Sequence, residues 1–153
     1  MFDCSHDAEF WIRHALGCVP AEMFERFDEN LAFVCMDSSD GRRLTQEFRE
    51  NHEIIILSER IVPRGCLAED NSKVRYFMFV VLHEIAHAYC GHLAPTAISP
   101  DENAAQEQDA DKLAYRWFNG YLTSKNLPEF TELELEKAMG ESRADWEKAF
   151  GNL

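Results

Sequence analysis

The sequence predicts an α+β fold: a short sheet of about three strands, mixed or antiparallel, packed on a long helix, with further helices C-terminal to it. Short apolar and β-branched runs gather between residues 31 and 57, whereas apolar residues recur at helical spacing before and after them. The 153 residues also contain no repeat, low-complexity stretch or Gly/Ser linker. We therefore expect a single domain over residues 1–153.

The first 27 residues are predicted to form two helices. Apolar residues recur at helical spacing from Phe10 to Ala15, and Gly17 ends this run. Pro20 then suits the start of a second, short helix that continues through Phe27.

The predicted strands follow directly. Leu31 to Met36 is short and apolar, residues 37–41 have turn chemistry (Asp-Ser-Ser-Asp-Gly), and Arg42 to Phe48 reads as a polar returning strand. These three segments favour a hairpin. Ile54 to Leu57 is a β-branched run and the clearest strand in the chain.

Helices are predicted for most of the rest of the chain. A long helix from about Ser72 to Cys90 meets Gly91, which suits a left-handed terminator. Ser99 with Glu102 forms a capping box that starts the next helix, and Asn119-Gly120 is its expected end. Two further short acidic helices, separated by Gly140, are expected at residues 132–139 and 142–150.

The charge balance bears on partners. Asp and Glu number 28 against 15 Lys and Arg, a formal net charge of −13. A surface this acidic repels phosphate backbones and anionic lipid, so we expect no nucleic-acid partner and no membrane partner. Such a charge usually keeps a protein soluble, and the more specific alternative is that it binds a basic protein. The oligomeric state is not indicated by the sequence.

Cysteine usage points to a cytoplasmic protein. The five cysteines are odd in number, widely spaced and form no Cys-x-x-Cys pair, unlike a secreted disulfide framework. We expect all five to be buried, reduced thiols. No signal peptide is visible at the N-terminus. The longest apolar run, Tyr76 to Cys90, has 15 residues, too few to span a bilayer, and is read as a buried helix.

The most informative stretch of the sequence is an H-E-x-x-H motif, which begins at His83 and ends at His87. Residues four apart on a helix project to the same side, so both imidazoles can bind one ion. Zn²⁺ is the metal that two imidazoles, a third protein ligand and a water suit best. Glu84, next to the first histidine, is expected to take a proton from a water at the metal.

A third ligand is expected from the next helix. Glu107 and Asp111 lie four residues apart inside its otherwise apolar face, where unpaired acids are costly. His83 stands eight residues before Gly91 and Glu107 eight residues after Ser99, each about 12 Å from the turn between the helices. Glu107 is therefore predicted as the third ligand, and Asp111 as an acceptor for an imidazole N–H.

These motifs resemble those of gluzincin-type zinc peptidases, in which an H-E-x-x-H helix is followed by a helix carrying E-x-x-A-D. The matching residues here are His83-Glu84-Ile85-Ala86-His87 and Glu107-Gln108-Asp109-Ala110-Asp111. With the strand block ending at Ile54–Leu57 and Arg75-Tyr76-Phe77 leading into the motif, residues 30–120 look most like the ImmA/IrrE family of small intracellular metallopeptidases. The resemblance implies a zincin-like fold, bound Zn²⁺ and hydrolysis of peptide bonds.

Several assignments around the motif stay open. His92 is a rival ligand, although it follows His87 by five residues where metzincins use six; otherwise it caps the helix or lines the cleft. His92, Tyr89 and Tyr115 are also candidates to stabilise the oxyanion or line the cleft, as is Tyr76. Two functions are therefore weighed: a zinc peptidase acting on a protein or peptide, and a non-catalytic zinc-containing module of phage or mobile-element type that docks a protein. The intact Glu84 favours the enzyme.

Overall fold

The computed structural model of the chain describes residues 1–25, 31–36, 41–48 and 52–151. Its elements, in chain order, are β1 (Phe2–Asp3), α1 (His6–Leu16), α2 (Ala21–Phe24), β2 (Leu31–Met36), β3 (Gly41–Phe48), β4 (His52–Ser58), η1 (Glu59–Ile61), α3 (Ser72–Cys90), η2 (Pro95–Ala97), α4 (Pro100–Ser124) and α5 (Glu132–Phe150). The predicted α+β class is confirmed.

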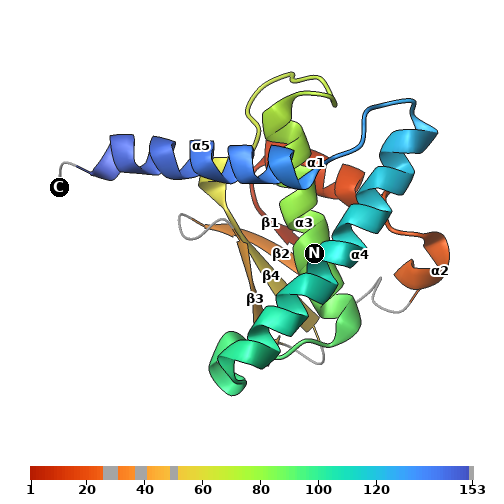
Figure 1. The fold of residues 1–153 in the computed structure, drawn as a ribbon, viewed down its shortest axis with the longest axis vertical. Coiled ribbons are helices and arrows are strands. Elements are labelled where there is room, and N and C mark those ends of the chain that lie inside the picture. The colour runs from red at the N-terminus through yellow and green to blue at the C-terminus, as the bar shows by residue number, and fades with distance from the viewer. Residues whose placement is uncertain (26–30, 37–40, 49–51, 152–153) are drawn as a thin grey trace.

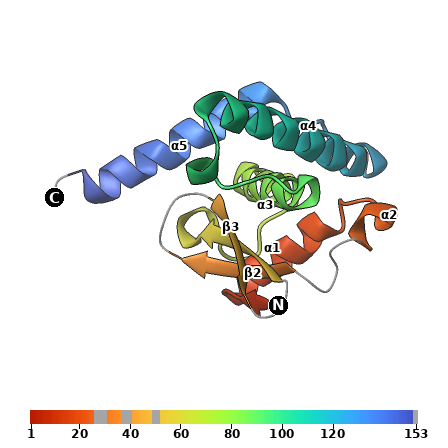
Figure 2. The same ribbon diagram turned by 90° about the horizontal axis from the view of Figure 1, so that it is seen from below.

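Helix α3 runs through the middle of the molecule. The sheet and α1 lie on one side of it and α4 on the other (Figures 1 and 2). Seven of its apolar side chains are fully buried: Val74, Phe77, Met78, Val81, Leu82, Ile85 and Ala86. The helix begins where the Asn71 side chain accepts a hydrogen bond from the Lys73 N–H, and it ends at Gly91 in the left-handed conformation (φ 66°). The predicted bounds are therefore confirmed.

The sheet is mixed and has four strands in the order β1-β2-β4-β3. β2 is parallel to β1 and to β4, whereas β3 is antiparallel to β4. The predicted hairpin between residues 31–36 and 42–48 is therefore wrong, because β4 lies between those two strands. The physical reason is that Ile55 and Leu57 of β4 are fully buried, and such a strand is most stable in the centre of a sheet. The turn predicted at residues 37–41 falls almost wholly outside the described residues.

The N-terminal helices are close to expectation. α1 ends at Gly17, as predicted, and Ala8, Ile12 and Ala15 on its inner face are fully buried. α2 starts after Pro20, and its described part ends at Phe24; the expected extension to Phe27 lies outside the described residues.

Helix α4 starts as predicted and ends later than predicted. The capping box of Ser99 and Glu102 is present. The helix passes through Asn119 and Gly120 to Ser124, because Leu122 is fully buried in the core. Burying that side chain contributes more than the roughly 1 kcal/mol that a helical glycine costs.

The two short C-terminal helices predicted around Gly140 are one helix, α5. Gly140 continues the helix, again because its cost is only about 1 kcal/mol. The first turn of α5 is attached to the body: Arg75 binds Glu134 and the Pro128 and Glu129 carbonyls. The far end of the helix projects away from the body (Figure 1).

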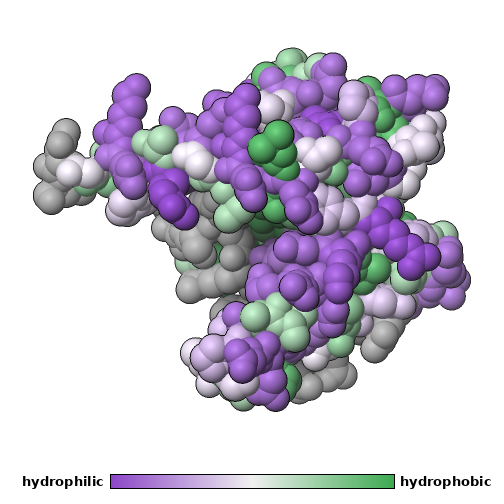
Figure 3. All heavy atoms as spheres, viewed as in Figure 1, coloured by the Kyte–Doolittle hydropathy of each residue, from purple (hydrophilic) through white to green (hydrophobic). Residues whose placement is uncertain are grey.

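The cysteine prediction is partly wrong. None of the five cysteines is in a disulfide, but Cys66 and Cys90 are exposed, whereas Cys18 is buried and Cys4 and Cys35 are partly buried. Cys90 is exposed because it lies at the end of α3, where the helix leaves the core. Among the described residues, no helix combines the length and apolar character needed to cross a bilayer. Hydrophilic residues cover most of the face over α4 and α5 (Figure 3).

Candidate metal centre

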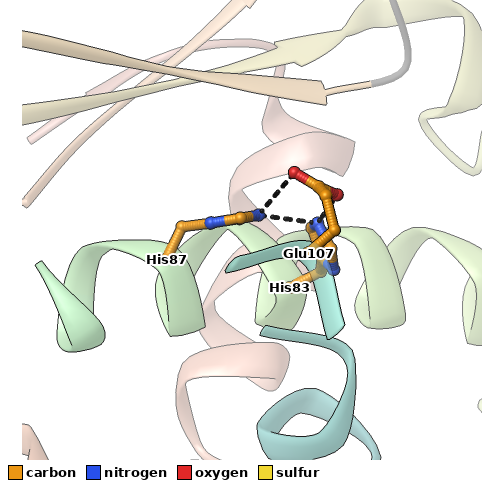
Figure 4. Close-up of side chains that lie close together, drawn as sticks. All are labelled: His83, His87 and Glu107. Carbon is orange, nitrogen blue, oxygen red and sulfur yellow. Dashed lines mark hydrogen bonds and ion pairs between the residues drawn. The ribbon is translucent and has the colours of Figure 1, made fainter. Parts of the chain in front are cut away.

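Two packed helices bring together the three predicted ligands. His83 and His87 lie one turn apart on α3, and Glu107 reaches them from α4, which runs back along α3 (Figures 1 and 4). The two imidazole Nε2 atoms are 3.0 Å apart. The Glu107 carboxylate oxygens lie 3.3 Å from His83 Nε2 and 3.2 Å from His87 Nε2. The expected level of Glu107 opposite the histidine pair is confirmed.

The opposite edge of the His83 ring is held by Asp111. The two groups are 2.9 Å apart, from His83 Nδ1 to Asp111 Oδ1. An ionised carboxylate only accepts hydrogen bonds, so Nδ1 carries the hydrogen and donates it. In the neutral ring, Nε2 then presents a lone pair toward His87 and Glu107. This is the role predicted for Asp111.

His92 stands in the same relation to His87. The two Nδ1 atoms are 2.9 Å apart, so one ring donates and the other accepts. When His87 donates, its Nε2 is also a lone pair directed at the centre. His92 contacts His87 through Nδ1, the ring nitrogen opposite the one that faces His83 and Glu107, and it is not part of the three-residue cluster. The alternative in which His92 replaces a ligand is therefore not the arrangement observed.

The loop that carries His92 is fastened by Gln106, a residue that the sequence analysis did not single out. The Leu93 N–H donates to Gln106 Oε1 (2.8 Å), and Gln106 Nε2 donates to the Leu93 carbonyl (3.3 Å). Gln106 precedes Glu107, so one turn of α4 supplies a ligand and also holds the loop. No sequence pattern marks a glutamine for such a task, because its partner is backbone.

The donor set fits a divalent metal. When Asp111 and His92 each accept the Nδ1 hydrogen of the ring they contact, two imidazole lone pairs and a carboxylate face a common point, which favours a cation there or a proton on one imidazole. Bonds of 2.0–2.2 Å in tetrahedral Zn²⁺ sites place neighbouring donor atoms about 3.3 Å apart, close to the 3.0–3.3 Å observed here. The three donor atoms lie within 4.8 Å of one another.

The electrostatics of the metal-free centre agree with this reading. Burial by itself lowers the pKa of His83, but hydrogen bonds to Asp111 and Glu107 outweigh it and raise that pKa to about 10. The same contacts, with His83 and then His87, hold the pKa of Glu107 well below its usual range. At neutral pH the His83 ring therefore carries a second proton, so the cluster favours a positive charge between the two imidazoles and the Glu107 carboxylate.

Glu84 lies within the influence of this centre. Its side chain is buried, with 6% of the residue exposed, and its negative charge contributes to the raised pKa of His83. By contrast, the Glu107 side chain is 47% exposed and that of Asp111 is 42% exposed. The centre is thus closed on the Glu84 side and open to solvent on the α4 side.

The remaining candidates lie among aromatic side chains. Tyr115 packs on Phe79 and Phe130, and Phe79 in turn lies 6.4 Å from His83 between ring centroids. The Tyr115 hydroxyl is buried without a hydrogen-bond partner among the described residues. Burial first, then the charge of Asp111, raises its pKa to about 12. Tyr89 packs edge-on against the Trp117 ring. Their predicted role toward an oxyanion stays a prediction.

Comparison with known families gives one match. Residues 74–140 match the family Peptidase U49, a stretch that begins in α3, contains every residue of the centre and ends within α5. The match supports a peptidase family without specifying the ImmA/IrrE type. No curated protein and no solved structure matches the chain.

Proposed function

We propose that this protein is a zinc-dependent metallopeptidase similar to the ImmA/IrrE enzymes. The observation that carries the proposal is the convergence of His83, His87 and Glu107 at mutual distances of 3.0–3.3 Å. It is supported by the peptidase-family match, which covers all three residues. From the composition we further propose a cytoplasmic protein that acts on a protein or peptide, without nucleic-acid or membrane partners.

The chain's own residues suggest how the reaction runs. His83, His87 and Glu107 would hold the metal, which when bound supplies Lewis-acid polarisation of a water and of a peptide carbonyl. Glu84 acts as general base: it accepts a proton from the attacking water and then delivers it to the leaving amine nitrogen. Asp111 accepts a hydrogen bond from His83 Nδ1, and His92 would accept one from His87 Nδ1. Both Nε2 atoms would then stay directed at the metal.

One edge of the sheet lies near the candidate metal centre, and an extended peptide could pair with its backbone there. β4 is internal, because β2 and β3 flank it. Its neighbour β3 is the terminal strand of the described sheet, and it packs on α3. We propose that the outer edge of β3 receives the substrate backbone, while the substrate carbonyl lies at the centre.

The alternative function, a non-catalytic binding module with a structural zinc, has less support. Structural zinc sites have closed, four-residue coordination. Only three candidate ligands gather here among the described residues, and Glu107 is 47% exposed. A half-open site with a buried glutamate next to the first histidine suits catalysis better than structure.

The test compares wild-type protein with Glu84→Gln, which keeps the side-chain shape and removes the base. Metal content is measured by plasma mass spectrometry, and cleavage is measured on a mixture of unstructured peptides. We expect about one metal ion per chain in both proteins and cleavage at least 100-fold slower in Glu84→Gln. Equal cleavage by the two proteins refutes this mechanism. Bound zinc with no cleavage of peptides, or of proteins captured by Glu84→Gln, favours the binding module.

A further inference from the structure

Cys4 and Cys35 lie side by side on neighbouring strands. β1 pairs with β2 in parallel, with Phe2 opposite Phe33 and Asp3 opposite Val34. Cys4 directly follows Asp3, at the bend where β1 ends, and Cys35 directly follows Val34 on β2, so the two cysteines come next to the last paired residues. The Phe2 and Phe33 rings, two residues earlier on each strand, stack at 5.7 Å.

The two thiols are close enough to shift each other's pKa: Cys35, as a hydrogen-bond donor, lowers the pKa of Cys4, and Cys4 raises that of Cys35. Neighbouring strands lie about 4.8 Å apart, within the roughly 4.4–6.8 Å between Cα atoms that disulfides require. Both residues are partly buried, and neither is in a disulfide. The chain therefore holds two thiols on neighbouring strands, each with a path to solvent.

We propose that Cys4 and Cys35 form a reversible disulfide when the protein meets a low-molecular-weight disulfide oxidant, and that this bond fastens the N-terminal strand to the sheet. β1 has only two residues and covers the edge of β2 that β4 does not occupy. It is also attached through Met1, whose ammonium donates to the Leu31 carbonyl and whose carbonyl accepts from the Phe33 N–H. A covalent link at Cys4 would hold this short strand in place.

The order of the steps follows from the contact. Burial raises the pKa of Cys4, but the hydrogen bond from Cys35 lowers it again in part, whereas burial and the adjacent Cys4 raise the pKa of Cys35 to about 12. Cys4 is therefore the attacking thiol. Its thiolate bonds to one sulfur of the oxidant and expels the other half as a thiolate, which takes up the proton that Cys4 lost.

The second step closes the pair. The Cys35 sulfur loses its proton, attacks the Cys4 sulfur of the mixed disulfide and expels the second half of the oxidant, which is protonated to a thiol. In sum, two protein thiols are oxidised to one disulfide and the oxidant is reduced to two thiols. No other oxidant is needed, and an excess of a small thiol reverses the reaction.

The other cysteines provide internal controls. Cys66 and Cys90 are exposed, so they report whether the oxidant reacts at all, and Cys18 is buried. Burial raises the pKa of Cys18 to about 12, which makes it the least reactive of the remaining three. A Cys66→Ser/Cys90→Ser variant leaves only Cys18 to compete with the proposed pair.

The experiment treats dilute, natively folded full-length protein with oxidised glutathione at mildly alkaline pH and follows intact mass and non-reducing peptide maps. We expect a species about 2 Da lighter in Cys66→Ser/Cys90→Ser, with one cross-link joining the peptides of Cys4 and Cys35. In wild type we expect the same cross-link together with about 305 Da for each glutathione on Cys66 or Cys90. In Cys35→Ser, which cannot close the pair, Cys4 should instead keep a glutathione adduct of about 305 Da.

Stability gives a second measurement. The oxidised Cys66→Ser/Cys90→Ser protein should melt at least about 5 °C higher than the reduced one, and dithiothreitol should abolish the difference. The proposal is overturned if Cys66 acquires glutathione while Cys4 and Cys35 remain free, if Cys4 and Cys35 carry only separate adducts, or if the cross-link joins other cysteines. These results do not depend on the metal centre or on peptidase activity.

Discussion

His87 and His92 face each other through their Nδ1 atoms at 2.9 Å, five residues apart in sequence and on opposite sides of the Gly91 turn. The left-handed Gly91 turns the chain back, so the imidazole that follows the helix lies behind the imidazole on its last turn. Histidine is an unusual partner for a metal-facing histidine, because carboxylates and backbone carbonyls are the common ones. His87 thus has an imidazole behind it, whereas His83 has a carboxylate.

We expect His92→Ala to weaken metal binding by about 10- to 100-fold, the usual cost of losing an outer partner of a ligand. The reason is that His87 Nδ1 loses its acceptor, and the ring is then free to turn or to protonate Nε2. Competition against a chromophoric chelator measures the affinity without any need for substrate. His92→Asn, which keeps a hydrogen-bond acceptor, should recover part of the loss, and His14→Ala on α1 should change nothing. Equal affinity in His92→Ala and wild type would argue that His92 does not orient His87.

We expect Glu107→Gln to weaken metal binding by more than about 100-fold, because removing a charged ligand costs more than removing an outer partner. The amide has nearly the same shape, so the fold should be unchanged. The matched control is Asp109→Asn, which removes the same charge from the exposed side of α4, two residues away. Equal losses in the two variants would mean that general acidity attracts the metal, and that Glu107 is not a ligand.

Metal binding should strengthen as the pH rises. The pKa of His83 in the metal-free protein, about 10, lies above its ordinary 6.5, so below pH 10 a metal must displace a proton from this ring. Each pH unit between about 6.5 and 10 should therefore raise the apparent affinity by up to tenfold. Chelator competition at pH 6.5, 7.5 and 8.5 measures the slope. A flat profile would show that His83 is neutral before the metal arrives.

The same pKa governs the stability of the metal-free protein. Because folding raises the pKa of His83, protonation stabilises the folded state. That contribution is fully present below pH 6.5 and is lost as the pH rises toward 10. The melting temperature of chelator-treated protein should thus fall between pH 6.5 and 10 by more in wild type than in His83→Asn. Parallel curves for the two proteins would contradict the assignment, and His14→Asn is the control for a histidine outside the centre.

Arg75 should be the most costly arginine to remove. Its side chain is 6% exposed, binds Glu134 at 2.6 Å and also donates to the carbonyls of Pro128 and Glu129. Arg75→Met would leave Glu134 and two carbonyls without their donor, and we expect a loss of about 3–5 kcal/mol in the free energy of unfolding. Urea denaturation measures it. Arg13→Met, at an exposed ion pair with Glu9, should cost no more than about 1 kcal/mol.

Local signals accounted for the elements that carry the centre. The bounds of α3, the capping box of α4 and the spacing of His83 and His87 depend on residues within four or five positions of one another, so the sequence predicts them directly. The level of Glu107 could also be predicted, because a short connection forces α4 back along α3 with only a small error in register. The peptidase-family match agrees with the motif.

Only the tertiary structure decided the order of the strands, the continuity of α5 and the place of His92. Strand order depends on which strand buries both of its faces. β4 does so and therefore lies between β2 and β3, although the local sequence favours a hairpin of β2 with β3. Gly120 and Gly140 do not end their helices, because one glycine destabilises a helix by only about 1 kcal/mol. At Gly120 the burial of Leu122 outweighs this loss. His92 and Gln106 act through contacts that the Gly91 turn and the α3–α4 packing create. The sequence by itself therefore determined the candidate ligands and their helices. Long-range packing determined what surrounds them, because pairing energies between distant segments leave no local pattern.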